Sequence, residues 1–393
     1  MQYYILTQNN RFSGTEYQVP VPVPDTAYSY GVMEFDKTTT TTKNKTWKLL
    51  QKATIDEIWS HEWGTETKCN KIYPSIASCL IPPTYKRDEV PIKISLVDKD
   101  CKSDGKTHVR VTNKQQTKEE KGKKNFIICV KPLDLKNGLT IQTIRQWIKI
   151  NFKLGADKII FYADNVNADD LNVIKSNYTL IRKFTTEKFS DCSSYAESLW
   201  YKRKMEIITY NDCFYSHLYE TNFVIPLDVD EVIVPKKGNN WREGFLNYFN
   251  KTGNETLNFH ILKNYASFSV RNAYFFSKYP KNSIGKKKKK WRRKISGDVN
   301  LNDTIFDRTV RSYHLSPISD SVKSFIYVPN TLSVFNHYSY HVFDHVTRQY
   351  FFPKNIFQLN HYRNFCDPIL IDNCQQFLNP VVYDDTLKKL IKL

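Results

Sequence analysis

Three acidic residues, Asp228, Asp230 and Glu231, directly follow the apolar segment 223–227. In open α/β sheets, ligands bind at the carboxyl ends of strands, so acids in this position lie where a ligand would be held. If the segment continues as a strand, alternation points the side chains of Asp228 and Asp230 to one side. Two such carboxylates can hold a divalent ion that also bridges two phosphate oxygens, directly or through water. We therefore predict a metal site that neutralises charge on a departing diphosphate.

A solvated turn is the competing interpretation of this D-x-D pattern, because acidic residues are frequent in turns. The position of the pattern after a buried strand favours the metal site. Within the pair, Asp228 is the residue expected to act through water or on a ribose.

Strands that alternate with helices must position these acids, and this pattern begins at residue 125. Residues 126–130 are a continuous apolar run, typical of a strand buried on both faces of a parallel sheet. Apolar residues then recur at helical spacing from Ile141 to Phe152, between Thr140 as N-cap and Gly155 as C-cap. Further strands are predicted at 158–163 and 180–184, and a long helix at 194–219. Repeated β-α-β units predict an α/β fold with a mostly parallel sheet flanked by helices.

The first part of the chain lacks this alternation. We predict that residues 1–123 form a β-rich accessory or stem region, which ends in the charged segment 114–124, and that residues 124–393 form the sheet domain. β-like runs are expected at 90–97 and 108–111 in the first region, and at 257–262, 322–328 and 334–342 in the second.

The formal net charge of +18 first suggests a polyanionic partner. Much of this charge is local, because residues 281–294 contain seven Lys and two Arg and no acid. We interpret the run 286–294 as a solvated loop, and attraction to acidic glycans or lipid head groups is the alternative. A nucleic-acid binder would spread basic residues and interleaved aromatics over one face, so no nucleic acid is expected.

The cysteines and glycosylation sequons favour a lumenal or extracellular location. The chain has eight cysteines without a zinc-binding spacing, and Asn-x-Ser/Thr sequons at Asn44, Asn177, Asn250, Asn254 and Asn302. In an oxidising lumen, Cys192 would pair with Cys213 and Cys366 with Cys374. Cys129, inside a predicted buried strand, would be a small core residue. No segment reaches the roughly 18 apolar residues of a membrane span.

Five short motifs in a fixed order make residues 125–374 similar to glycosyltransferase family 92. They are Cys129-Val130-Lys131-Pro132-Leu133, Leu154-Gly155-Ala156 before Phe161-Tyr162, Asn211-Asp212-Cys213, Asp228-Val229-Asp230-Glu231 with Pro235, and His361-Tyr362-Arg363. The resemblance implies a GT-A-like (Rossmann-like) fold and galactose transfer from UDP-galactose to a glycan on a glycoprotein or glycolipid, with inversion. It also implies a type II Golgi membrane protein, whose anchor is not visible in this sequence.

GT-A enzymes commonly take a third metal ligand from a distant histidine, and the resemblance nominates His361. An imidazole ligand suits Mn²⁺ better than Mg²⁺, so Mn²⁺ or a similar cation is the expected cofactor. A surface histidine beside an ion-paired Arg363 is the alternative. Lys323 and Arg363 are expected to add positive charge near the diphosphate.

The ends of the first two predicted strands supply the remaining donor-binding candidates. Lys131 and Pro132 would lie near the base and ribose, and Asp164 would hydrogen-bond the uracil or ribose. Ordinary strand-end turns are the competing interpretation for all three residues.

The residues alone do not single out a catalytic base. Inversion requires a carboxylate within hydrogen-bond reach of the acceptor hydroxyl, and Asp303, Asp307 and Asp344 are equally placed in the acceptor half. A catalytically silent, glycan-binding protein that keeps the fold is the main alternative function. The chain lacks G-x-x-x-x-G-K-[ST], H-E-x-x-H and G-x-S-x-G, which argues against P-loop nucleotide hydrolases, zincin proteases and α/β-hydrolases.

Overall fold

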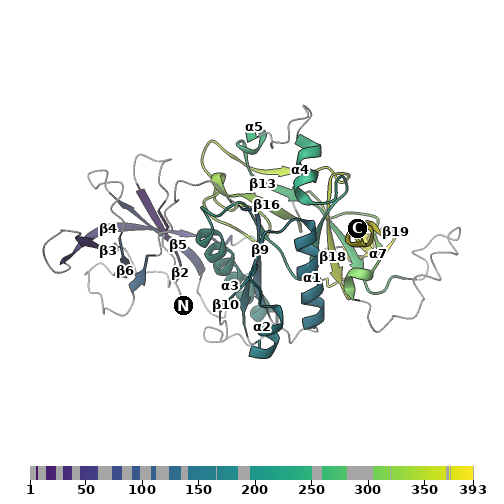
Figure 1. Cartoon of the computed structure of the whole chain (residues 1–393), viewed down its shortest axis with the longest axis horizontal. Coiled ribbons are helices and arrows are strands. Elements are labelled where there is room, and N and C mark those ends of the chain that lie inside the picture. The colour runs from purple at the N-terminus through teal and green to yellow at the C-terminus, as the bar shows by residue number, and fades with distance from the viewer. Residues whose placement is uncertain are drawn as a thin grey trace. The chain divides into compact units, whose positions relative to one another are not determined.

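The computed structural model of the chain is shown in Figure 1. It describes residues 6–7, 15–23, 30–37, 45–60, 73–81, 91–97, 108–111, 124–133, 140–164, 166–184, 195–249, 259–280, 304–318, 320–368, 371 and 373–392. Contacts divide the chain into two compact units. The first comprises Met1–Lys123, Phe184–Glu220 and Ser333–Phe335, and the second comprises Lys124–Lys183, Thr221–Leu332 and Asn336–Leu393. The division into domains at residues 123 and 124 stays a prediction.

A seven-stranded antiparallel sheet lies in the first unit, which confirms the predicted β-rich N-terminal region. Its order is β1-β2-β5-β4-β3-β6-β7. The strands are Leu6–Thr7, Thr15–Val23, Tyr30–Lys37, Lys45–Glu57, Tyr73–Ile81, Lys93–Val97 and His108–Arg110, numbered β1 to β7 along the chain. The predicted long helix is also present as α3 (Tyr195–Ser216), and it packs against β2 and β5 within this unit.

A mixed sheet of seven strands forms the centre of the second unit (Figure 1). Its order is β10-β9-β8-β11-β16-β13-β17. The strands are β8 (Lys124–Leu133), β9 (Lys158–Ala163), β10 (Thr179–Lys183), β11 (Thr221–Pro226), β13 (Tyr265–Val270), β16 (Lys323–Tyr327) and β17 (Thr347–Phe351). Neighbours from β10 to β11 are parallel, β16 is antiparallel to β11 and β13, and β17 is parallel to β13. The predicted α/β fold with a mostly parallel sheet is therefore confirmed.

The first helix of this unit begins and ends as its capping residues predict. In α1 (Ile141–Leu154), the Thr140 hydroxyl accepts a hydrogen bond from the Thr143 amide, and Gly155 ends the helix at φ 115°. A left-handed residue at this position favours glycine because it has no Cβ. The shorter helices are α2 (Ala168–Ile174), α4 (Trp241–Phe249), α5 (Phe259–Leu262), α7 (Cys374–Leu378) and α8 (Thr386–Lys392).

A small sheet lies beside the central one in the order β12-β18-β14. Its strands are β12 (Glu231–Pro235), β18 (Phe357–Arg363) and β14 (Asn272–Phe276). Strand β18 is antiparallel to β12, with Glu231 opposite His361, and parallel to β14, with Tyr274 opposite His361. A two-stranded pair joins β15 (Val310–Ser312) to β19 (Val381–Tyr383).

Two predicted β-like runs are wrong. Residues 259–262 of the run 257–262 form helix α5, and residues 334–342 form bends with single bridge residues at Val334, Ser339 and Val342. Periodicity does not separate a short apolar run in a strand from one in a helix or loop, so tertiary contacts decided both cases.

Aromatic side chains hold the central sheet against its helices. Phe126 of β8 stacks on Phe223 of β11 with ring centroids 5.4 Å apart, and Phe245 of α4 meets Phe325 of β16 edge-on at 5.0 Å. All four side chains are buried. Burying each Phe stabilises the fold by about 1.5–3 kcal/mol relative to exposure. This packing supports the turn that follows β11.

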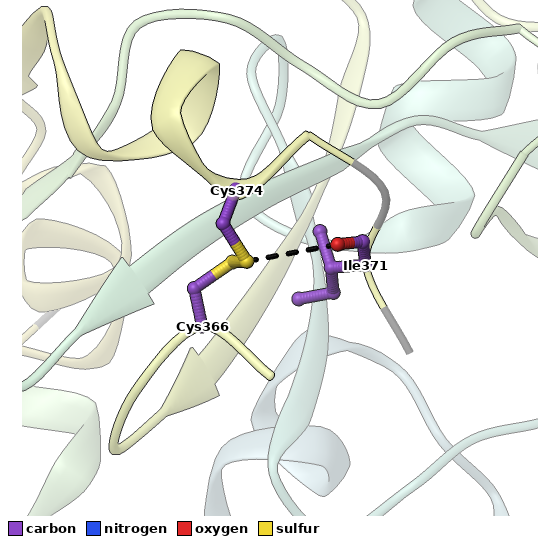
Figure 2. Close-up of a disulfide and its surroundings, with 3 residues drawn as sticks. All are labelled: Cys366, Ile371 and Cys374. Carbon is purple, nitrogen blue, oxygen red and sulfur yellow. Dashed lines mark hydrogen bonds between the residues drawn. A yellow bond between two sulfur atoms is a disulfide. The ribbon is translucent and has the colours of Figure 1, made fainter. Parts of the chain in front are cut away.

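Four of the described cysteines are disulfide-bonded, and one of the two predicted pairs is present. Cys366 and Cys374 form a disulfide, which ties the segment after β18 to the start of α7. Figure 2 shows the Cys374 sulfur facing the carbonyl oxygen of Ile371 at 3.6 Å. The interpretation of Cys129 as a plain core thiol is wrong, because Cys129 is disulfide-bonded, and Cys213 is a disulfide cysteine as well. Cys192 lies outside the described residues.

Disulfides are typical of proteins of the secretory pathway. Among the helices that the structure describes, none combines the length and apolar character needed to cross a membrane.

Candidate active site

A short turn between β11 and β12 carries the acidic cluster. Strand β11 ends at Pro226, and the Leu227 amide still donates to the Cys129 carbonyl of β8 at 3.1 Å. The Glu231 amide then donates to the Asp228 carbonyl at 2.9 Å, which closes the turn and begins β12. The prediction that strand alternation aligns Asp228 and Asp230 is therefore wrong. The chain turns from one sheet into the other between them, and the two carboxylates meet different neighbours.

Two lysines hold the Asp228 carboxylate. The Lys131 ammonium lies 3.0 Å from Asp228 Oδ2, and the Lys323 ammonium lies 3.6 Å from the same oxygen. Burial would raise the pKa of Asp228, but the two positive charges outweigh this effect and keep it well below its usual value. Asp228 is thus ionised and already charge-compensated by protein side chains.

Glu231 lies underneath this pair. Its Oε2 accepts a hydrogen bond from the Asp228 amide at 3.1 Å and lies 3.3 Å from the Lys323 ammonium. The side chains of Glu231 and Lys323 are only 4% and 3% exposed. Burial raises the pKa of Glu231, and the negative charge of Asp228 adds to this effect against the attraction of Lys323. Glu231 therefore stabilises the turn through its hydrogen bond to the Asp228 amide, and its buried side chain is not accessible to a substrate.

Asp230 and His361 form the second pair of the site. The Asp230 Oδ2 lies 3.4 Å from the His361 Nε2, and the Asp230 side chain is 29% exposed. Burial opposes ionisation of Asp230, but His361 outweighs it and lowers the pKa of the carboxyl. Backbone pairing fixes the arrangement, because the Tyr362 amide donates to the Asp230 carbonyl at 2.8 Å.

The far side of the His361 ring is held by two residues. Nδ1 lies 3.0 Å from the side-chain nitrogen of Asn272 on β14 and 3.5 Å from Glu231 Oε1. The Asn272 amide oxygen is buried, and none of the described residues forms a hydrogen bond with it. A half-turn of the amide would place this oxygen against Nδ1, where it would accept the Nδ1 proton. Nε2 would then present its lone pair beside Asp230, which is the state required of a metal ligand.

These observations test whether the residues fit a metal ion. Within the described part of the chain, no group of three His, Cys, Asp or Glu side chains is arranged as a ready-made metal cage. Asp230 and His361 supply one carboxylate oxygen and one imidazole nitrogen, a donor set that suits Mn²⁺. The ammonium groups of Lys131 and Lys323 both contact Asp228 Oδ2. Asp228 is therefore better suited to bind the metal ion through a water molecule than to bind it directly. Asp230 and His361 together fit a metal ion whose other coordination positions are filled by substrate oxygens and water.

The remaining donor-binding candidates are distributed around this turn. Lys131 and Lys323 contact Asp228 directly. Pro132 is buried in β8 opposite Tyr162 of β9, and Asp164 is buried just after β9, where its amide donates to the Leu133 carbonyl at 3.2 Å. Strands β8, β9 and β11 run parallel, so Lys131 and Pro132 near the end of β8, Asp164 after β9 and the acidic turn after β11 lie at the same edge of the sheet. Buried Asp164 is not a solvated turn acid.

Arg363 lies at the end of β18, two residues after His361. Residues two apart in a strand share a face, so the Arg363 side chain starts on the same face as the imidazole. Its carbonyl is bound by the Ser277 amide at 3.1 Å and by Arg308 at 2.8 Å. Arg363 is thus close to the pair in sequence and register.

Two of the three candidates for a catalytic base, Asp307 and Asp344, lie in the described part of the chain. Asp307 caps the short helix at Ile305–Asp307 through Thr304 and lies 3.4 Å from the Lys388 ammonium. Asp344 is an exposed loop residue. Asp303 lies outside the described residues. Asp307 therefore stabilises the start of this short helix.

Sequence reasoning missed Asn272 and Tyr274 of β14. The Tyr274 ring lies beside the His361 ring, with centroids 5.6 Å apart. Burial raises the pKa of Tyr274 to about 12. The only signal was the apolar segment 272–276 with one polar residue at its start, which gives no hint of the neighbouring strand.

Residues 124–391 match the family model described as Glycosyltransferase family 92. This match confirms the resemblance found in the motifs between residues 125 and 374. A comparison with curated proteins finds no match.

Proposed function

The chain belongs to glycosyltransferase family 92, and from this membership we propose that it transfers a sugar to a glycan acceptor in a metal-dependent, inverting reaction. Galactose from UDP-galactose is the proposed donor, following the family resemblance of the motifs. The acceptor is a glycan on a glycoprotein or glycolipid. The observation that carries the proposal is the pairing of Asp230 with His361 at 3.4 Å beside the lysine-bound Asp228.

Asp230 and His361 are proposed to hold the cation, with Mn²⁺ as the best match to one carboxylate and one imidazole. When bound, such an ion stabilises negative charge on the departing diphosphate without proton transfer. Asn272 and Glu231 orient the imidazole from behind, at 3.0 and 3.5 Å from Nδ1. Second partners of this kind hold a histidine ligand in its binding tautomer.

Lys131 and Lys323 are proposed to add positive charge next to the phosphates. Lys131 is 35% exposed and forms a partly solvated ion pair, so it can exchange Asp228 for a phosphate oxygen. Lys323 is 3% exposed and stays between Asp228 and Glu231. Asp228 then acts through water or on the ribose. Pro132, Asp164 and Arg363 complete the proposed donor site.

A GT-A-like fold is proposed for residues 124–393. Three features support it: parallel strands from β10 to β11, acids directly after β11, and a small sheet that brings a histidine to the turn. The proposed location is the Golgi lumen, as a type II membrane protein. The disulfides and the five sequons support a secretory route.

A donor screen tests the proposal directly. The full chain, produced in a secretory host, is incubated with a panel of UDP-sugars with Mn²⁺ or with EDTA, and release of UDP is measured with and without glycan acceptors. We expect release that depends on Mn²⁺, is fastest with UDP-galactose and rises with acceptor. Glycan binding without UDP release under any condition would instead support the catalytically silent alternative.

A further inference from the structure

The turn between α2 and β10 presents an asparagine to solvent. Residues 175–178 connect Ile174, the last residue of α2, to Thr179, the first residue of β10. The Thr179 amide donates to the Ser176 carbonyl at 3.3 Å, which closes the turn around Asn177. Asn177 itself is exposed. A group attached to its side chain would therefore extend into solvent without disturbing the turn.

This asparagine begins the sequon Asn177-Tyr178-Thr179, in which the middle residue is not proline. It is the one sequon of the chain whose asparagine lies among the described residues. The Thr179 hydroxyl donates to the Ile174 carbonyl at 2.7 Å and lies 2.9 Å from the Ser176 hydroxyl, and Thr179 is buried. An enzyme that recognises this threonine must therefore act before the turn has formed, as an enzyme that modifies nascent chains does.

Large apolar side chains are exposed around the same turn. They are Val173 of α2, Tyr178 of the turn and Leu180 of β10. Each is within four residues of Asn177, which limits its Cα to at most about 15 Å from that of Asn177. The Tyr178 ring meets the Phe152 ring of α1 edge-on at 6.0 Å, which holds it at the surface. Several exposed apolar side chains in one region of a protein mark a surface that is normally covered.

The strand that follows the turn is at the end of a sheet. Strand β10 is the last in the order of the central sheet, and among the described strands it pairs with β9 alone. An unpaired strand edge can bind another chain and start aggregation, and proteins commonly cover or charge such edges. The start of β10 therefore combines an open edge with exposed apolar side chains.

The turn lies at the opposite edge of the sheet from the candidate active site. Asn177 precedes β10, whereas the acidic turn follows β11, and the strands from β10 to β11 are parallel. Strand β11 has 6 residues, so its two ends are roughly 20 Å apart at about 3.3 Å per residue. A bulky group on Asn177 would leave the acidic turn open to substrates.

We propose that Asn177 carries an N-linked glycan that shields the exposed apolar side chains around this turn and the start of the β10 edge. A glycan on asparagine is bulky and solubilising, as this surface requires. The inference needs entry into the secretory pathway, which the disulfides support, and it does not depend on the transfer reaction proposed above.

The attachment consumes an oligosaccharide linked to a lipid diphosphate, and a transferase of the host catalyses it. The side-chain nitrogen of Asn177 bonds to the anomeric carbon of the first sugar and gives up one proton to a base of that enzyme. The bond from the anomeric carbon to the phosphate oxygen breaks, and its electron pair leaves with the lipid diphosphate.

The test uses the full chain secreted from animal cells. Mass spectrometry of peptides that contain residue 177, before and after enzymatic removal of N-glycans, should find the glycan on wild type. Asn177→Gln should lose it, fall several-fold in secreted yield and form aggregates, because the apolar side chains and the strand edge are then uncovered. UDP release per secreted monomer should stay at the wild-type value. The matched control is Asn172→Gln, an exposed asparagine of α2 outside any sequon, which should resemble wild type.

A second variant separates shielding from an effect on folding. Adding Val173→Lys and Leu180→Thr to Asn177→Gln makes the surface polar, so it should restore yield and the monomeric state without the glycan. An unmodified residue 177 in the wild-type protein would overturn the proposal. So would an Asn177→Gln variant as soluble as wild type, or a defect that the polar substitutions leave in place. A glycosylated chain without transferase activity would contradict the proposed function alone and leave this inference intact.

Discussion

Glu231 and His361 are register partners across the β12–β18 pair, and Glu231 Oε1 lies 3.5 Å from His361 Nδ1. The other oxygen of this carboxyl group, Oε2, accepts a hydrogen bond from the Asp228 amide and lies near the Lys323 ammonium. One buried side chain therefore connects the acidic turn, the lysine and the imidazole. This connection explains how residues separated by 130 positions form one site.

Replacing Asp230 by Asn should abolish most of the activity and preserve the fold. The change removes a charge but nearly keeps the shape of a partly exposed side chain. Loss of a contact to developing charge costs on the order of 3 kcal/mol, or about a hundredfold in rate. We expect a wild-type Tm, a higher Mn²⁺ requirement and a loss of that size in transfer from UDP-sugar. Wild-type transfer by this variant in the presence of chelator would contradict the metal site.

Lys131 and Lys323 should differ sharply when each is replaced by Met. Lys131 is partly exposed, so Lys131→Met should weaken UDP-sugar binding, with little change in stability because exposed ion pairs contribute about 0–1 kcal/mol. Lys323→Met leaves Asp228 and Glu231 buried with one cation fewer. Breaking a buried pair typically costs about 3–5 kcal/mol. Urea unfolding and UDP titration measure both effects, and equal stability losses would disprove the contrast.

Asn272→Ala should weaken metal binding through His361. The variant removes the side chain that lies 3.0 Å from Nδ1, while Asp230 and His361 both remain. Loss of a residue that orients a ligand typically lowers metal affinity about 10–100-fold. Titration with Mn²⁺ measures the metal affinity, and titration with UDP in the absence of metal shows whether the rest of the site is intact. Unchanged Mn²⁺ affinity in a folded variant would show that Asn272 does not orient the imidazole.

Asp384 should make the second unit sensitive to acid. The carboxylate lies 2.9 Å from both Lys236 and Arg311 and is 6% exposed. Burial would raise the pKa of Asp384, but Lys236 and its other partners outweigh this and lower it. A lowered folded-state pKa gives stability that is present above the unfolded-state value and is lost as pH falls, so unfolding free energy should drop below about pH 4.

The Asp384→Asn variant provides the control for this prediction. It should lose roughly 3 kcal/mol at neutral pH, because Lys236 and Arg311 keep their charges without the carboxylate. Its stability should then depend less on pH between 4 and 2 than that of wild type. Urea midpoints measured across this range check both statements, and parallel pH curves for the two proteins would refute the role of Asp384.

Local patterns were sufficient for several elements of the second unit. The cap residues Thr140 and Gly155 correctly bounded α1, because their conformations depend on their immediate neighbours. The apolar run at 126–130 correctly indicated a buried parallel strand, although β8 extends to Leu133. The motifs also identified the family, and the disulfide between Cys366 and Cys374 joins residues close in sequence.

The neighbours of the acidic residues could not be predicted in the same way. The sequence by itself determined that acids follow a buried strand and that a histidine stands far downstream, because both are properties of short segments. Only the tertiary structure decided that Lys131 and Lys323 bind Asp228, and that Asn272 and Tyr274 flank His361. The physical reason is that strand order and register set these contacts, and both result from packing the whole sheet.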